Sequence, residues 1–133
     1  MIISCKNYST LSIEYFDALL AANGGLTIAH NHHDYQSGYV VGGARGFNEV
    51  TVPYMLGCSF TAAAEIAVRL NLGHDVGVWV ETWTVLGQAL YELVIDSVDV
   101  HTAQGAAMLC ACSRGERTYY HIDTNEVIAT YIN

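Results

Sequence analysis

The sequence predicts a single α+β domain over residues 1–133, in which about three helices pack on a mainly antiparallel sheet of short strands and hairpins. A chain of 133 residues, 52% of them hydrophobic, is long enough and apolar enough to bury a core. Strand-like segments separated by turn residues recur along it, and a few segments carry apolar residues at helical spacing. We find no linker, low-complexity tract or charge run that marks a second domain.

The first predicted elements are a helix and a short strand. Residues 11–20 place Leu11, Phe16, Leu19 and Leu20 broadly on one side of a helix, and Ser9 or Thr10 can cap it. The run Asn23-Gly24-Gly25 should end this helix. Residues 26–29 then predict a short strand, and the polar stretch 30–37 predicts a loop.

The middle of the chain predicts a hairpin followed by a second helix. Residues 38–43 and 47–54 are rich in strand formers and are separated by Ala44-Arg45-Gly46, so we expect them to pair, with Pro53 at a strand end or edge. Residues 60–71 predict a helix capped by Ser59. Its inward stripe would be Ala63, Ile66, Ala67 and Leu70, and Glu65 would pair with Arg69 on the outside.

The second half predicts two paired strands, a third helix and a final hairpin. The strands are residues 76–82 and a segment within 85–98. Asp99 or Thr102 can cap a helix that runs to about Cys112 and is lined by Ala103, Ala106, Ala107 and Cys110. Residues 118–122 and 127–132 predict the final hairpin. Its last strand should lie at a sheet edge, where it favours pairing with a second copy in a homodimer.

Charge limits the classes of partner. Thirteen carboxylates face five Lys and Arg residues, and the formal net charge is −8. Such a protein is a poor direct ligand for a nucleic-acid backbone, which is held by cations, but it suits a basic protein partner, including one that itself binds nucleic acid. Neither a signal-peptide pattern nor an apolar run of roughly 18 residues occurs, so we expect no membrane contact and a cytoplasmic location. The four cysteines are predicted to be buried thiols.

A His-rich segment is the sharpest candidate for chemistry. His30 and His32 are two apart and would point the same way on an extended chain, so they could share a transition metal with Asp34 as an oxygen ligand. A hydrolytic site would need a further ligand from His74, Asp75, His101 or His121. A polar loop that happens to be rich in His is the favoured alternative, so we expect no cofactor. The glycine-rich run 42–46 resembles an anion-binding nest, but a tight turn explains it better.

Aromatic residues and carboxylates together predict a protein-binding surface. Nine tyrosines and two tryptophans are many for this length, and both types bury area while keeping a polar group. Core packing is the alternative role for them. The residues that we expect at a binding surface are Asp34, Tyr35, Glu49, Tyr54, Glu81, Trp83, Tyr91, Glu92 and Asp96.

Four segments carry a resemblance: GGLTI at 24–28, GYVVGG at 38–43, GVWVE at 77–81 and RGERTYYHIDTNEVI at 114–128. Together they resemble a pattern in small accessory proteins of bacteria, phages and plasmids, similar in outline to anti-CRISPR or antirestriction inhibitors. The resemblance implies a non-enzymatic protein that inhibits a host defence protein which binds nucleic acid. We keep two other hypotheses: a small metal-dependent hydrolase that uses the segment 30–34, and a self-associating structural or regulatory module.

Overall fold

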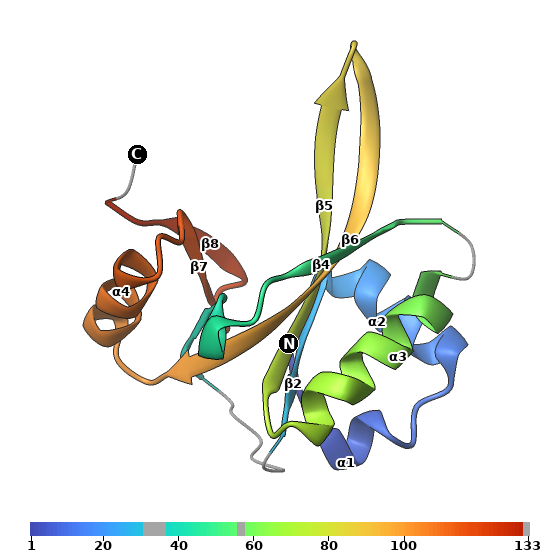
Figure 1. The fold of residues 1–133 in the computed structure, drawn as a ribbon, viewed down its shortest axis with the longest axis horizontal. Helices are drawn as coiled ribbons and strands as arrows, with labels where there is room; N and C mark the ends of the chain where they lie inside the picture. Colours follow the sequence, from blue (N-terminus) through green and yellow to red (C-terminus); the bar gives the residue numbers. More distant parts are fainter. Residues whose placement is uncertain (31–36, 56–57, 132–133) are drawn as a thin grey trace.

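A computed structural model describes residues 1–30, 37–55 and 58–131, and it confirms the α+β class (Figure 1). In this part of the chain the helices are α1 (Cys5–Tyr8), α2 (Ile13–Asn23), α3 (Cys58–Asn71) and α4 (Gln104–Ser113). The strands are β1 (Ile2–Ser4), β2 (Gly25–Ala29), β3 (Tyr39–Val41), β4 (Val50–Pro53), β5 (Asp75–Val85), β6 (Gln88–His101), β7 (Thr118–His121) and β8 (Glu126–Ala129). None of the described helices has the length and apolar character needed to cross a bilayer.

The strands form one mainly antiparallel sheet in the order β1-β2-β5-β6-β3-β7-β8, with β4 also on β6. Only the β1–β2 pair is parallel among the described pairings. Most strands are short, as predicted, but β5 has 11 residues and β6 has 14. The long strand β6 joins the two halves of the sheet because β5 and β4 pair with its first part and β3 with its end.

The predicted hairpin between residues 38–43 and 47–54 is wrong. β3 and β4 do not face each other: Val41 lies opposite Asp99, and Val50 lies opposite Ile95. Both strands therefore run in the same direction along one edge of β6, joined by the short 3-10 turn η1 (Ala44–Gly46). The intervening glycines suit a hairpin equally well in sequence, but β6 is long enough to pair with both segments. Pro53 ends β4, as predicted for a strand end.

The larger core lies between α2, α3 and one face of the sheet. Phe16 and Leu20 of α2 and Ile66 of α3 are buried against strand residues that include Val78 and Ile95. α2 begins two or more residues later than predicted because the Ser12 side chain, rather than that of Ser9 or Thr10, accepts the first-turn amide hydrogen bond. Gly24 ends this helix in the left-handed conformation, as its sequence predicts.

α3 is rotated from its predicted orientation. Its buried positions are Cys58, Ser59, Ala62, Ile66 and Arg69. The predicted Glu65–Arg69 ion pair forms, with 2.9 Å between Nε and Oε1, but Arg69 is only 1% exposed and points inward. The reason is that Ser97 of β6 and the Asn48 carbonyl of the loop before β4 accept hydrogen bonds from the guanidinium inside. Ser59 lies within the helix and bonds Asp17 instead of capping α3.

A second, smaller core lies under α4. Ala107 and Ala111 of α4 pack against Val41 and Tyr119 of the sheet, and Cys110 is partly buried beside them. Ala103 and Ala106, predicted on the same face, are exposed, because Ala103 precedes the helix and Ala106 lies on its outer side. Neither Asp99 nor Thr102 caps α4: the N-cap residue is Ala103, which makes no side-chain cap bond, and Asp99 belongs to β6. β7 and β8 pair as the predicted final hairpin, and β8 is at the end of the strand order.

Candidate functional site

The strands β5 and β6 continue beyond the rest of the sheet as a projecting hairpin, visible at the top of Figure 1. β2 pairs with β5 only as far as Trp79, and β4 pairs with β6 only as far as Glu92. Val80 still packs against the larger core. We call residues 82–91 the arm, because among the described pairings the two strands there pair only with each other.

The arm ends in a two-residue turn whose first residue, Leu86, is of a type that is unusual there. Val85 lies opposite Gln88, and the two residues between them both have positive φ: 51° at Leu86 and 79° at Gly87. Such a turn matches the twist of a hairpin and favours Asn-Gly. The left-handed conformation is unfavourable for leucine by roughly 1–2 kcal/mol. Its side chain is 99% exposed, so no neighbouring group holds it there.

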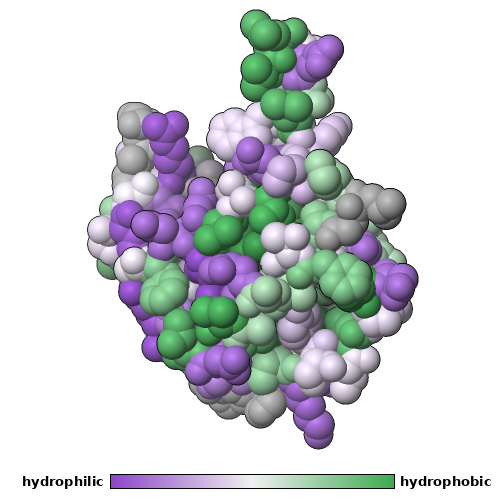
Figure 2. All heavy atoms as spheres, turned by 45° about the vertical axis from the view of Figure 1, so that its right-hand side comes forward, coloured by the Kyte–Doolittle hydropathy of each residue, from purple (hydrophilic) through white to green (hydrophobic). Residues whose placement is uncertain are grey.

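One face of the arm carries an apolar strip of three side chains, interrupted by Gln88 opposite Val85. Side chains alternate along a strand, and directly opposite residues share a face. Trp83 pairs with Leu90 and stands on the same face as Val85, and each of these three is about half exposed. Figure 2 shows hydrophobic side chains gathered at the end of the arm, away from the body. Exposed apolar side chains grouped in this way mark interaction surfaces.

Two carboxylates stand at the base of the arm on the same face. Glu81 and Glu92 are directly opposite in the register, an arrangement that like charges disfavour. Indole N–H groups bind both: Trp79 Nε1 donates to Glu81 at 3.0 Å, and Trp83 Nε1 donates to Glu92 at 3.1 Å. The tryptophans fix the carboxylates in place without neutralising them.

Glu49 adds to this negative region. Burial raises the pKa of its carboxyl, and the nearby carboxylates of Asp96, Glu81, Glu116 and Glu92 raise it further. All of the charges that shift its pKa are therefore negative. A cationic group of a partner would meet a favourable potential at the base of the arm.

The structure brings six of the nine predicted binding residues to the arm or its base. Four of them lie on the hairpin: Glu81, Trp83, Tyr91 and Glu92. Glu49 is near enough to Glu81 and Glu92 for their charges to raise its pKa, and the Tyr54 amide donates to the Tyr91 carbonyl at 3.0 Å. Asp96 is 3% exposed and is part of the interior instead. Asp34 and Tyr35 lie outside the described residues. Sequence reasoning missed Val85, Leu86 and Leu90, although the pair Leu86-Gly87 between strand residues was a signal for a turn.

Several buried polar groups surround the Arg69 side chain between the sheet and α3. Its guanidinium donates to Ser97 Oγ at 2.9 Å and to the Asn48 carbonyl at 2.6 Å, and it lies 3.9 Å from Asp96 Oδ1. Ser97 Oγ also lies 2.8 Å from His74 Nδ1. Burial lowers the pKa of His74, and the nearby cations of Arg45 and Arg69 lower it further.

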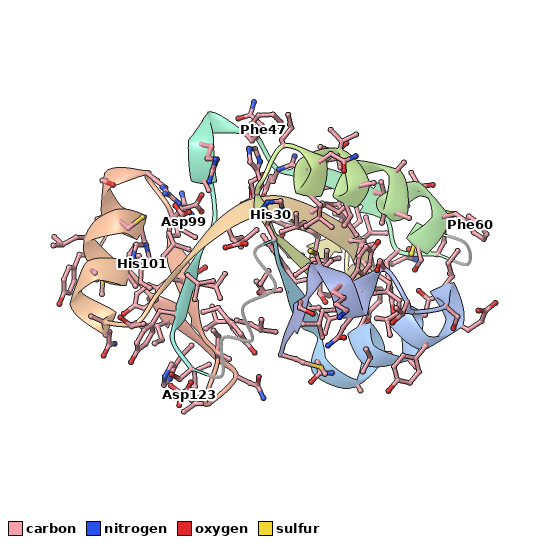
Figure 3. All side chains as sticks on the ribbon, turned by 90° about the horizontal axis from the view of Figure 1, so that it is seen from below. His30, Phe47, Phe60, Asp99, His101 and Asp123 are labelled. Carbon is pink, nitrogen blue, oxygen red and sulfur yellow. The ribbon has the colours of Figure 1, made fainter. Side chains whose placement is uncertain are left out.

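The glycine pair at 42–43 is a structural junction, not an anion site. The Gly43 amide donates to Asp96 Oδ2 at 2.9 Å, and Arg114 donates to the Gly42 carbonyl at 3.1 Å while pairing with Asp99. A Cβ at Gly42 would lie 2.5 Å from Asp96 Oδ2, so glycine is required there. Figure 3 shows Asp99 on the α4 side and Phe47 beside α3. These contacts join the two halves of the molecule.

The metal hypothesis depends on residues that the structure does not describe. His32 and Asp34 fall within 31–36, and His30 is bound through its backbone amide to Asp75 Oδ1 at 2.7 Å. Across residues 1–30, 37–55 and 58–131, no group of three or more His, Cys, Asp or Glu side chains is arranged to hold a metal ion. Among the predicted buried thiols, only Cys58 is buried, and Cys5, Cys110 and Cys112 are partly exposed.

Comparison of the chain with family models, curated proteins and solved structures gave no significant match. The candidate site therefore stands on its own geometry and charge.

Proposed function

We propose that this protein acts by binding another protein, into which it inserts the tip of the arm. The observation that carries the proposal is the grouping of Trp83, Val85, Leu86 and Leu90 on a hairpin that projects from the body. Side chains held on a paired hairpin lose little further freedom on binding, which favours affinity. Nothing in this role requires chemistry on a substrate.

The energetics favour the tip as the central contact. Fully burying a leucine side chain stabilises a complex by roughly 1.5–3 kcal/mol, and Leu86 starts almost completely exposed. Trp83 and Tyr91 belong to the residue types that dominate binding free energies in protein interfaces. The arm thus combines an aliphatic tip with aromatic side chains behind it.

Charge indicates the chemistry of the partner. The carboxylates of Glu81 and Glu92 stand behind the apolar strip on a protein of net charge −8. The complementary partner has an apolar pocket bordered by Lys or Arg. Such a pairing accelerates association and weakens as salt screens the charges.

The sequence resemblance supplies the biological side of the proposal. A basic surface is typical of proteins that bind nucleic acids. A small acidic accessory protein of a phage or mobile element would inhibit such a host defence protein by occupying that surface. The partner is therefore proposed to be a host nucleic-acid-binding protein rather than nucleic acid itself.

Site-specific photo-cross-linking tests the proposal. A cross-linking amino acid at Leu86 should capture one predominant basic protein from host lysate, and the same probe at Leu72, an exposed leucine just after α3, should not. The captured protein, purified, must then bind the unmodified chain with an affinity that falls as salt rises. Equal capture from both positions, or a purified partner that does not bind, would contradict the proposal.

A further inference from the structure

A second surface, separate from the arm, lies where the sheet ends at β8. Among the described strands β8 pairs only with β7, so its outer edge presents backbone N–H and C=O groups without a strand partner. Proteins protect such edges with Lys, Pro or bulges. The β8 sequence EVIA has neither Lys nor Pro, and Val127 is 69% exposed.

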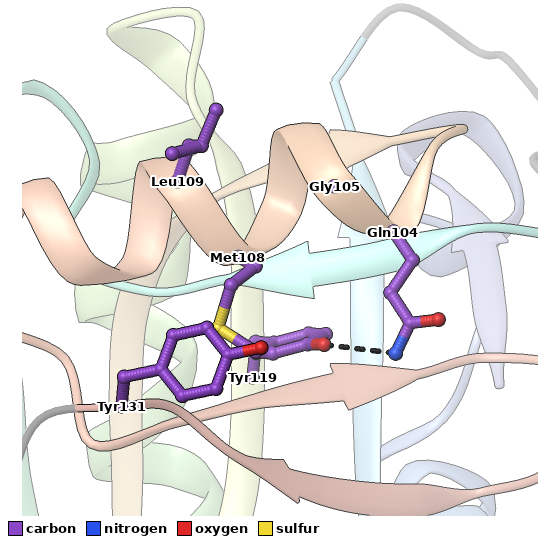
Figure 4. Close-up of a pocket in the computed structure, with 6 residues that line it drawn as sticks. All are labelled: Gln104, Gly105, Met108, Leu109, Tyr119 and Tyr131. Atoms are coloured by element: carbon purple, nitrogen blue, oxygen red, sulfur yellow. Dashed lines mark hydrogen bonds between the residues drawn. The ribbon is translucent and has the colours of Figure 1, made fainter.

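A shallow apolar depression lies on the α4 side of this region (Figure 4). It has a volume of about 530 Å³ and is lined by Gln104, Gly105, Met108, Leu109, Tyr119 and Tyr131. Gln104 Nε2 donates to the Tyr119 hydroxyl at 3.0 Å, which fixes its floor. Leu109 is 74% exposed and Tyr131, two residues after β8, is 84% exposed. Tyr131 therefore continues the apolar lining from α4 to the chain just beyond β8, whereas Val127, opposite Tyr120, stands on the other face of the sheet.

Charge distinguishes this surface from the arm. α4 has the sequence QGAAMLCACS, without a charged residue, and β8 contains only Glu126. Of the 13 carboxylates in the chain, all except that of Glu126 lie outside α4 and β8. Two acidic copies repel least when they meet through their least charged surfaces, and screening at physiological salt limits the remaining repulsion to about 8 Å. This surface suits a second copy, whereas the arm suits a basic protein.

We infer that two copies of the chain pair β8 against β8 in antiparallel fashion around a two-fold axis perpendicular to the sheet. Each copy supplies the same edge, as an isologous dimer requires. Such an axis keeps both α4 helices on the same face of the joined sheet, so Leu109 and Tyr131 of one copy approach those of the other. In an antiparallel pair, directly opposite residues lie on the same face of the sheet. The two-fold axis must therefore pass beside one residue of β8 that lies opposite its own copy, and not between two neighbouring residues.

The other exposed edges fit a second copy less well. Among the described strands β4 pairs only with β6, but its edge ends in Pro53, a residue that protects an edge because it cannot donate a ladder hydrogen bond. β1 has three residues and runs directly into α1, which leaves little strand to pair. The free edges of the arm stand beside the opposed carboxylates of Glu81 and Glu92, and a two-fold there would bring four carboxylates together. The inference is independent of the proposed function, because the arm takes no part in the dimer.

Sedimentation and native mass spectrometry test this inference with variants at exposed positions. Val127→Lys places a charge on the edge at the two-fold, and Leu109→Glu places one on α4; both side chains are largely exposed, so the fold of one copy should tolerate them. Val68→Lys on the outer face of α3 is the matched control, because Val68 is 51% exposed. Circular dichroism would confirm that each variant is folded.

We expect a mass of 29.0 kDa for the unmodified chain, twice 14.5 kDa, at tens of micromolar. Val127→Lys and Leu109→Glu should each raise the dissociation constant of the dimer about tenfold or more, and Val68→Lys should leave it unchanged. A monomer at every concentration would overturn the inference, as would a dimer unaffected by Val127→Lys and Leu109→Glu. Loss of the arm leaves this dimer intact, so failure of one proposal is distinguishable from failure of the other.

Discussion

At the scale of single residues, Leu86 combines an unfavourable backbone with an exposed apolar side chain. Its φ of 51° places it in the left-handed region, where Asn is accommodated far better than Leu. Strained backbone conformations cluster at functional positions, which agrees with the proposed role of the arm tip.

Replacing Leu86 with Asn should therefore stabilise the free protein. We expect the free energy of unfolding to rise by about 1 kcal/mol, because Asn relieves the left-handed strain. Urea denaturation measures the change. Leu72→Asn makes the same replacement at an exposed site without positive φ and should give no gain. A fall in stability for Leu86→Asn would show that the turn is not strained.

Arg69 compensates a buried carboxylate, so its loss should be severe. Arg69→Met removes the bonds to Glu65, Ser97 and the Asn48 carbonyl and leaves Asp96 without its nearest cation. We expect the free energy of unfolding to fall by about 3–5 kcal/mol. Arg117→Met, at an exposed position, is the control, and adding Asp96→Asn to Arg69→Met should restore part of the loss. A loss equal to that of Arg117→Met would contradict the structural role of Arg69.

Glu116 makes stability depend on pH in a direction opposite to that of a salt-bridged carboxylate. Burial raises the pKa of its carboxyl and Asp96 adds to this, while Arg114 opposes it. The native state therefore binds more protons than the unfolded chain above the ordinary value of 4.5, and this contribution to the free energy of unfolding falls as pH rises through that window.

Glu116→Gln should remove that contribution. We expect its free energy of unfolding to decrease less between about pH 4.5 and pH 7 than that of the unmodified chain. Urea titrations at several pH values measure the slope, and Glu126→Gln, at the exposed first residue of β8, controls for the change in net charge. An unchanged slope in Glu116→Gln would mean that its carboxyl does not titrate differently on folding.

At the scale of elements, local signals predicted most segments but not their partners. Asn23-Gly24-Gly25 located the end of α2, and the alternation in 76–82 located β5. The segments 38–43 and 47–54 were recognised as strands, yet their pairing depends on the length of β6, which imperfect alternation in 85–98 concealed. Arg69 was placed outside because charge favours solvent, and only the hydrogen bonds to Ser97 and the Asn48 carbonyl reverse that preference.

Shortening the arm tests whether it is dispensable for folding. Replacing residues 83–90 with Asn-Gly keeps the Thr82–Tyr91 pair and closes it with a favoured two-residue turn. We expect native circular dichroism and a thermal midpoint close to that of the unmodified chain, because the removed side chains are exposed. Partner binding should be lost. A shortened protein that fails to fold would show that the arm is part of the structural core.

At the scale of the whole molecule, the acidic protein presents two different surfaces. The arm has an apolar tip backed by carboxylates, and the β8–α4 surface is apolar with little charge. Four of the residues that the sequence predicts at a binding surface, Glu81, Trp83, Tyr91 and Glu92, lie on the arm or at its base. Its projection could not be predicted, because it depends on where β2 and β4 stop pairing with the longer strands.

The most direct test of the arm measures the affinity of Leu86→Asn for the purified partner, beside its free energy of unfolding. We predict weaker binding, by about tenfold or more, in a variant that is at least as stable as the unmodified chain. Loss of affinity in a more stable protein can only come from the missing side chain at the tip. Unchanged affinity in that variant would contradict the assignment of the arm as the binding element.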